Sequence, residues 1–166
     1  MVDRVRGTGH AWRGKVEQVL RRVPRHWFVP DAEPAAAYHP WQAVITHRFE
    51  DGTSLSCASA PFVVAMMLDQ LDLQPGQNVL EIGAGTGYNA ALLAELTGTA
   101  ASVTTVDLDP DVTTAAARSL HQTGYSGGHV LTGDGTPGAP EYASDAQPSQ
   151  STPPSEVPPK AWRHQL

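Results

Sequence analysis

The fold of this chain is decided by the stretch Val79-Leu80-Glu81-Ile82-Gly83-Ala84-Gly85-Thr86-Gly87-Tyr88. Its apolar start is typical of a short buried strand, and the residues from Tyr88 to Leu96 suit a helix that Gly98 closes. Glycines between a strand and a helix permit backbone angles closed to other residues and let a ligand approach the main chain. The stretch therefore predicts a strand, a ligand-binding turn and a helix in succession.

Further strands and helices are predicted on both sides of this stretch. Upstream, Ala60–Leu73 is apolar almost all round and predicts a buried helix, with Ser59 as its N-cap and Pro61 in its first turn. The other predicted elements are a helix over Arg13–Val23, a strand over Val44–Thr46, a strand over Ser102–Asp107, a helix from the cap Asp109 to Gly124, and a strand over His129–Thr132. Alternating strands and helices predict an α/β fold with a parallel sheet, whose ligands bind where the strands end.

The spacing of the glycines separates two classes of nucleotide-binding fold. The dinucleotide fingerprint would need a third glycine at position 88, where the chain has Tyr88. The spacing, with Glu81 two positions before Gly83, instead resembles the glycine turn of S-adenosylmethionine (SAM) methyltransferases. SAM is therefore the predicted cofactor, bound at Gly83, Gly85 and Gly87.

Residues that follow the predicted strands supply the candidate side-chain contacts of this site. Asp107 ends the second strand, where a carboxylate can accept hydrogen bonds from both ribose hydroxyls, and Leu108 could pack on the adenine ring. Asp134 follows the third strand and could accept a hydrogen bond from the adenine amino group. Glu81 could hold the methionine ammonium directly or through water. The structural alternatives are a capping role for Asp107 and a plain turn role for Asp134.

Composition narrows the class of protein further. A length of 166 residues suggests one domain, and a net charge of −6 argues against a nucleic-acid partner. The longest apolar run, Phe62–Leu68, is far short of the ~20 residues of a membrane helix, and residues 1–20 lack the apolar core of a secretory signal. Cys57 is the only cysteine and the seven histidines show no metal-ligand spacing, so we expect no metal site and a cytoplasmic location.

The end of the chain differs in composition from the rest. Seven of the 14 prolines fall between Pro137 and Pro159, and Val, Ile, Leu, Met, Phe and Trp are missing from Thr132 to Glu156. Such a stretch cannot bury enough apolar surface to offset its ordering entropy, which predicts disorder. The expected organisation is an N-terminal helical extension over 1–58, a cofactor-binding core over 59–136 and a disordered tail over 137–166.

Three blocks of the sequence resemble the protein-L-isoaspartate O-methyltransferase family. They are Val23–Pro30, Ser59–Ala65 and Val79–Leu93. The resemblance implies a Rossmann-like SAM-dependent methyltransferase fold over about residues 13 to 143. After Asp134 the sequence departs from the family pattern, which returns at Val157–Leu166. We therefore expect a fold that is incomplete at its C-terminus, through truncation of a longer ancestor or through a disordered extension on a reduced protein.

The resemblance also implies an activity, which is methyl transfer from SAM to the free carboxylate of L-isoaspartyl residues in damaged proteins or peptides. By resemblance Ser59 would bind the substrate carboxylate, a role that competes with its use as a helix cap. The alternatives left open are an aspartate O-methyltransferase acting on a ribosomally made precursor peptide, and an inactive remnant. Weak or absent SAM binding is expected of the shortened chain, and nothing in the sequence indicates an oligomeric state.

Overall fold

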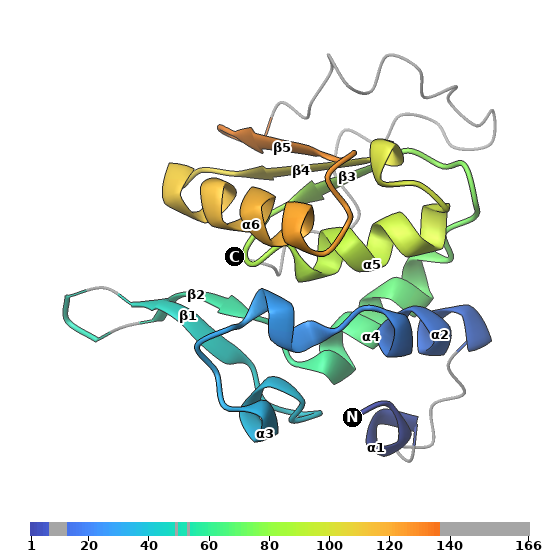
Figure 1. Cartoon of the computed structure of the whole chain (residues 1–166), viewed down its shortest axis with the longest axis horizontal. Helices are drawn as coiled ribbons and strands as arrows, with labels where there is room; N and C mark the ends of the chain where they lie inside the picture. Colours follow the sequence, from blue (N-terminus) through green and yellow to red (C-terminus); the bar gives the residue numbers. More distant parts are fainter. Residues whose placement is uncertain (7–12, 49, 53, 137–166) are drawn as a thin grey trace.

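A three-stranded parallel sheet organises the second half of the chain in the computed structural model, which describes residues 1–6, 13–48, 50–52 and 54–136 (Figure 1). The sheet is built from β3 (Val79–Ile82), β4 (Val103–Asp107) and β5 (His129–Thr132), in that spatial order. The connections run through α5 (Tyr88–Thr97), the short 3-10 helix η2 (Ala100–Ser102) and α6 (Pro110–Gln122). The predicted α/β class and parallel sheet are confirmed, whereas the predicted tail lies outside the described residues.

The register of the sheet brings the carboxyl ends of the strands together. Ile82 at the end of β3 lies opposite Val106, and Asp107 at the end of β4 lies opposite Thr132. Two main-chain hydrogen bonds continue this alignment beyond the strands, because the amide of Gly83 donates to Val106 and that of Gly133 donates to Asp107. The loops after all three strands therefore meet at one edge of the sheet, as predicted.

The first half of the chain is a set of short helices and one antiparallel hairpin. Its elements are α1 (Val2–Arg6), α2 (Gly14–Arg22), the 3-10 helix η1 (Arg25–Phe28), α3 (Pro34–Ala37), β1 (Val44–Arg48), β2 (Ser54–Ala58) and α4 (Pro61–Leu71). Strand β1 pairs with β2, which leads directly to Ser59 and then to α4. The hairpin thus delivers the predicted substrate-binding serine to the start of a helix.

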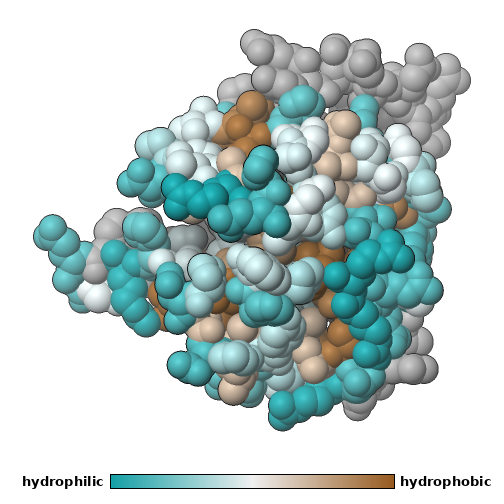
Figure 2. All heavy atoms as spheres, viewed as in Figure 1, coloured by the Kyte–Doolittle hydropathy of each residue, from teal (hydrophilic) through white to brown (hydrophobic). Residues whose placement is uncertain are grey.

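Helix α5 occupies the centre of the hydrophobic core. Figure 1 shows the sheet, then α5 and α6, then α2 and α4, and α5 contacts β4, α6 and α2. Eight of its ten residues are buried, which suits a helix of alanine and leucine without a polar face. On the face seen in Figure 2, hydrophilic residues predominate and hydrophobic ones form small separate patches.

Two local predictions about α4 are wrong. The N-cap is Ala60 and not Ser59, because Pro61 takes the first helical position and the residue before it takes the cap. The helix is also not buried all round, since Val63 is 38% exposed. It ends at Asp72, whose φ of 46° places it in the left-handed region. Cys57, near the end of β2, is exposed.

None of the helices in the described part of the chain has the length and apolar character of a membrane span. Within the same residues, no group of three or more histidine, cysteine, aspartate or glutamate side chains is placed to hold a metal ion.

Candidate functional site

The glycine turn between β3 and α5 is held in conformations that favour glycine. Gly83, Gly85 and Gly87 have φ values of 96°, 50° and 81°, all in the region that side chains disfavour. Gly87 has a second constraint, because a Cβ there would lie 3.1 Å from the carbonyl oxygen of Ala116 and 3.2 Å from Cγ of Leu120. The third glycine therefore lets the start of α5 pack closely against α6.

Gly85 faces open space by comparison. A Cβ at this position would meet only the carbonyl oxygen of Cys57, at 4.0 Å. The turn therefore leaves its main chain accessible at Gly85, as a site for a bound ligand requires. The same contact places the end of strand β2, two residues before Ser59, beside the glycine turn.

Asp107 connects the glycine turn to the start of α6. Its Oδ2 accepts a hydrogen bond from the amide of Gly85 at 3.3 Å, and its Oδ1 accepts one from the amide of Asp109 at 3.2 Å. Asp109 is the N-cap of α6, and its side chain accepts from the amide of Asp111 at 2.8 Å. The carboxylate of Asp107 is therefore fixed at the edge of the sheet beside the main chain of the turn.

Leu108 and Asp134 lie on the loops that flank Asp107. The side chain of Leu108 is 69% exposed, directly after the carboxylate of Asp107. Asp134 is also exposed, and its carboxylate accepts hydrogen bonds from the amide and hydroxyl of Thr136, which lower its pKa. Asp134 thus makes the turn contacts of the alternative interpretation, and its contact with adenine stays a prediction.

Glu81 is buried beneath the glycine turn, with 2% of its surface exposed. One carboxylate oxygen accepts a hydrogen bond from Nδ2 of Asn89 at 2.7 Å, and the other accepts one from Oγ1 of Thr105 at 2.7 Å. Burial raises the pKa of Glu81 to about 7, against the lowering effect of these two hydrogen bonds. The carboxylate joins β3, β4 and α5 from the inside, and its contact with a methionine ammonium stays a prediction.

Asn89 is a site residue that the sequence reasoning missed. It is the one amide side chain in α5, a helix otherwise dominated by alanine and leucine, and this isolation was the available signal. Its Nδ2 donates to Glu81, while its Oδ1 is buried without a hydrogen-bond partner among the described residues. The amide therefore orients the carboxylate and keeps one acceptor unused.

Ser59 is half-buried at the junction of β2 and α4. Among the described residues no hydrogen bond involves its hydroxyl, so the helix cap does not compete for this group. Its carbonyl oxygen accepts a hydrogen bond from Nη2 of Arg25 at 2.8 Å. Arg25 itself is buried, with 1% of its surface exposed.

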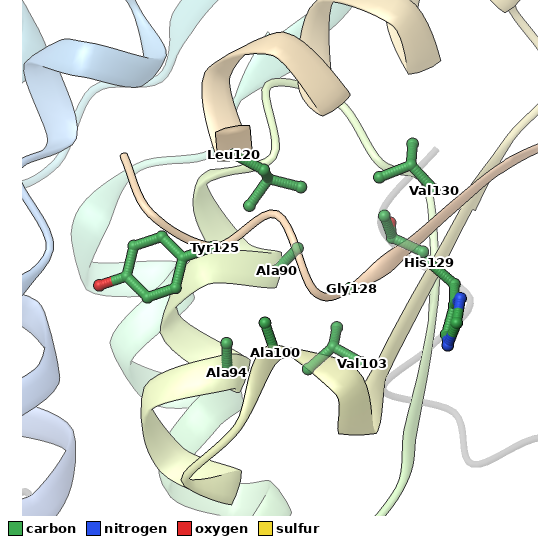
Figure 3. A pocket seen from close by; sticks show the side chains of 10 residues that line it. Ala90, Ala94, Ala100, Val103, Leu120, Tyr125, Gly128, His129 and Val130 are labelled. Carbon is green, nitrogen blue, oxygen red and sulfur yellow. The ribbon is translucent and has the colours of Figure 1, made fainter. Parts of the chain in front are cut away.

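A small cavity lies elsewhere, between α5, α6 and the starts of β4 and β5 (Figure 3). Its volume is about 10 Å³, and its lining includes Ala90, Ala94, Leu120 and Val130. A gap of this size and apolar lining has room for at most one water and few groups to bind it. It is a packing gap remote from the carboxyl edge of the sheet.

Comparison with known proteins gives consistent matches. The sequence matches the family described as Protein-L-isoaspartate(D-aspartate) O-methyltransferase (PCMT) over residues 1–166. It is 41% identical over 144 residues to a protein-L-isoaspartate O-methyltransferase of Aeropyrum pernix, covering 86% of this chain and 53% of that protein. A relative of the same name from Methanosarcina mazei is 43% identical over 129 residues, covering 78% of this chain and 50% of that protein. The chain thus spans about half the length of these curated relatives.

Solved structures agree on the fold. One protein-L-isoaspartate O-methyltransferase superposes with a TM-score of 0.70 at 26% identity, over 85% of this chain and 44% of that one. A second, a putative protein-L-isoaspartate O-methyltransferase from Plasmodium falciparum in complex with S-adenosyl-L-homocysteine, has a TM-score of 0.60 at 16% identity. The second match covers 79% of this chain and 59% of that one. The predicted Rossmann-like methyltransferase fold is therefore confirmed.

Proposed function

Because the chain belongs to the protein-L-isoaspartate O-methyltransferase family, we propose that it transfers a methyl group from SAM to the free carboxylate of L-isoaspartyl residues in damaged proteins or peptides. One observation carries the proposal. The carboxylate of Asp107 meets the main chain of the glycine turn, 3.3 Å from the amide nitrogen of Gly85, at the edge where all three strands end. This is the arrangement by which open α/β folds bind a ribose next to a glycine turn.

The residues at this edge fit the proposed cofactor. The turn is accessible at Gly85, a carboxylate stands beside it at Asp107, and Leu108 offers an exposed apolar side chain to a planar ring. Asp134 follows on the neighbouring loop, and its lowered pKa keeps the carboxylate ionised as an acceptor. Glu81 lies below the turn, where its buried carboxylate supports the site from β3. Bound SAM would supply a methyl group carried on a positively charged sulfur.

The substrate side of the site is proposed at Ser59. Its hydroxyl is not engaged within the described structure, and the strand that leads to it passes beside Gly85. A hydroxyl can donate one hydrogen bond to a substrate carboxylate and so hold it in a fixed direction. A carboxylate is already nucleophilic and needs no general base, so Ser59 would act by orienting it and the surrounding chain by excluding water.

The proposed segments of the chain correspond to the substrate side and the cofactor side of the site. We assign residues 1–58 to an N-terminal extension that completes the substrate side and residues 59–136 to the cofactor-binding unit, with residues 137–166 as a separate segment. A protein or peptide carrying isoaspartyl residues is the partner, and a cytoplasmic location is proposed with it. Peptide maturation, the other enzymatic interpretation, is not favoured, because the names of the relatives specify isoaspartate.

The test is transfer of a radiolabelled methyl group to an isoaspartyl-containing peptide by the purified chain. We expect Ser59→Ala to lower the rate by about 100-fold, as loss of one orienting hydrogen bond does, and Ser56→Ala, on the strand that leads to Ser59, to leave it unchanged. Asp107→Asn should weaken SAM binding by about tenfold in calorimetry, whereas Asp111→Asn, an exposed carboxylate in the first turn of α6, should not.

Two other outcomes would contradict the proposal. Transfer to a precursor peptide but not to an isoaspartyl peptide would favour the maturation enzyme. SAM binding without transfer to either peptide would favour the inactive remnant. Weak SAM binding by the wild-type chain is itself expected, so both assays need cofactor at concentrations well above its dissociation constant.

A further inference from the structure

Arg25 holds together two segments that sequence distance separates widely. Its Nε donates to the carbonyl oxygen of Ala37 at 2.8 Å. Its Nη2 donates to the carbonyl oxygens of Ala58 at 3.1 Å and Ser59 at 2.8 Å. These partners lie 12, 33 and 34 positions away along the chain. One planar guanidinium thus fixes the end of α3 and the main chain at the candidate substrate-binding serine.

The same side chain reaches the cofactor-binding half. The guanidinium carbon of Arg25 lies 4.8 Å from the centre of the Tyr88 ring, and Phe28 meets that ring edge-on at 5.6 Å between centres. Tyr88 is 3% exposed and is the first residue of α5, directly after Gly87. Arg25 is therefore in contact with both Ser59 and the residue that follows the glycine turn.

No carboxylate neutralises this buried cation within the described structure. Arg21 pairs with Asp3 and Glu17, and Arg22 pairs with Glu95, but the partners of Arg25 are carbonyl oxygens and an aromatic ring. Its Nη1 is buried without a hydrogen-bond partner among these residues. Burial lowers its pKa, yet a guanidinium remains charged in proteins.

Burying a charge without an opposite charge beside it costs desolvation free energy. An apolar side chain of similar size would pack the same volume without the desolvation penalty. The positive charge of Arg25 is held within hydrogen-bonding distance of Ser59, where the proposed function places a negatively charged group. The charge therefore has a use that packing does not explain.

We propose that Arg25 is a positioning residue that makes the Ser59 site selective for a carboxylate over a neutral group. The inference rests on the proposed function, since it concerns the substrate of the same site. The guanidinium fixes the main chain of Ser59, and its uncompensated charge favours an ionised carboxylate there over the uncharged carboxamide of the same shape.

The test compares two peptides that differ only in that group. One carries an isoaspartyl residue with its free carboxylate, and the other carries the corresponding carboxamide. Calorimetry with saturating S-adenosylhomocysteine, which permits binding without turnover, gives the ratio of their dissociation constants. We expect the wild-type chain to prefer the carboxylate peptide by at least about tenfold and Arg25→Met to reduce this ratio to about one. Affinity for S-adenosylhomocysteine should change by less than about threefold.

Two further variants separate charge from structure. Arg22→Met removes the same charge from a side chain that is 67% exposed, and it should leave the ratio unchanged. Arg25→Lys keeps the charge but not the planar fork, and it should retain most of the wild-type ratio although its stability falls. A merely structural Arg25 would instead lower the affinities for both peptides and for S-adenosylhomocysteine together, in both Arg25 variants.

The outcomes divide the two proposals. A wild-type chain that binds neither peptide would overturn the proposed function and this inference with it, whereas one that binds both equally would overturn the inference alone. A wild-type preference that Arg25→Met retains would overturn the inference alone. If circular dichroism shows that Arg25→Met is unfolded, the test rests on the ratio of dissociation constants measured for Arg25→Lys and on the salt dependence of the wild-type ratio. A buried charge is weakly screened, so the wild-type ratio should hold within about twofold from 50 to 500 mM NaCl, and a tenfold fall would refute the role of Arg25.

Discussion

The glycine turn and the Ser59 junction lie side by side but are built in opposite ways. The turn runs from β3 to α5 within a few residues, and its shape comes from backbone angles that three glycines adopt. The Ser59 junction is held by Arg25, whose partners lie up to 34 positions away. The glycine turn is therefore specified locally, whereas the Ser59 junction depends on contacts with distant segments, among them those of one buried side chain.

The largest expected loss of stability comes from a substitution in the glycine turn, the locally specified part of the site. Gly87→Val places a branched side chain at a φ of 81°, with its Cβ 3.1 Å from the main chain of α6. Conformational strain and overpacking together should lower the free energy of unfolding by about 4 kcal/mol, measured by urea denaturation. Gly98→Val is the control, because Gly98 has a φ of 86° but nothing within 4 Å of its Cβ. Equal losses in the two variants would show that the packing against α6 is unimportant.

The next effect concerns the buried carboxylate below the turn. Glu81 keeps its proton up to about pH 7 in the folded chain, whereas the unfolded chain releases it near pH 4.5. The folded state therefore binds more protons between these values, and the free energy of unfolding should fall as pH rises through this window, by up to about 3 kcal/mol. Denaturation curves of wild type and Glu81→Gln from pH 4.5 to 8 measure the difference. A flat difference between the two proteins would mean that Glu81 ionises normally.

A smaller loss of stability is expected from a substitution at the Ser59 junction, which depends on contacts between distant segments. Arg25→Met leaves the carbonyl oxygens of Ala37, Ala58 and Ser59 without their donor, while it relieves the burial of a charge. The net loss of stability should be about 2 kcal/mol. Arg22→Met, from an exposed ion pair with Glu95, should be nearly neutral in the same urea titration. A neutral Arg25→Met would show that these three hydrogen bonds contribute nothing to holding the junction.

The smallest effect sharpens the comparison within the sheet. The hydroxyl of buried Thr113 in α6 lies 2.6 Å from that of Thr132 at the end of β5. Thr113→Val should cost about 1 kcal/mol through loss of this bond and of the one that the same hydroxyl donates to the carbonyl oxygen of Pro110, whereas Thr114→Val on the exposed face of the same helix should cost little. If the two variants unfold at the same urea concentration, these bonds contribute nothing and the edge of the sheet is held by the main chain alone.

The sequence predictions are accurate where a feature depends only on residues close together in the chain. The strand over His129–Thr132, the cap at Asp109 and the stop at Gly98 follow from chemistry within a few residues, and the structure has them as predicted. The family resemblance also predicts a substrate-binding role for Ser59, which stays a prediction, whereas its predicted capping role is wrong by one residue.

The missed features are those that depend on distant partners. Arg25 is one of several basic residues near the end of a helix, and no local pattern distinguishes a guanidinium that will be buried against carbonyls from one that will face water. The role of Asn89 likewise depends on the assembled fold, which brings its side chain within hydrogen-bonding distance of Glu81. Side-chain burial is a property of the assembled fold, so it could not be read from spacing.

The central position of α5 has a consequence for how the molecule opens. This helix contacts α2 in the first half and β4 and α6 in the second, and nearly all of its residues are buried. Its amide protons can therefore exchange with solvent only when both halves separate from it at once. Hydrogen–deuterium exchange should find α5 the slowest element of the chain, with α1, at the edge of the fold, exchanging much earlier. The first and second halves of the chain would then unfold as one cooperative unit, although only the glycine turn is specified by residues close together in the sequence.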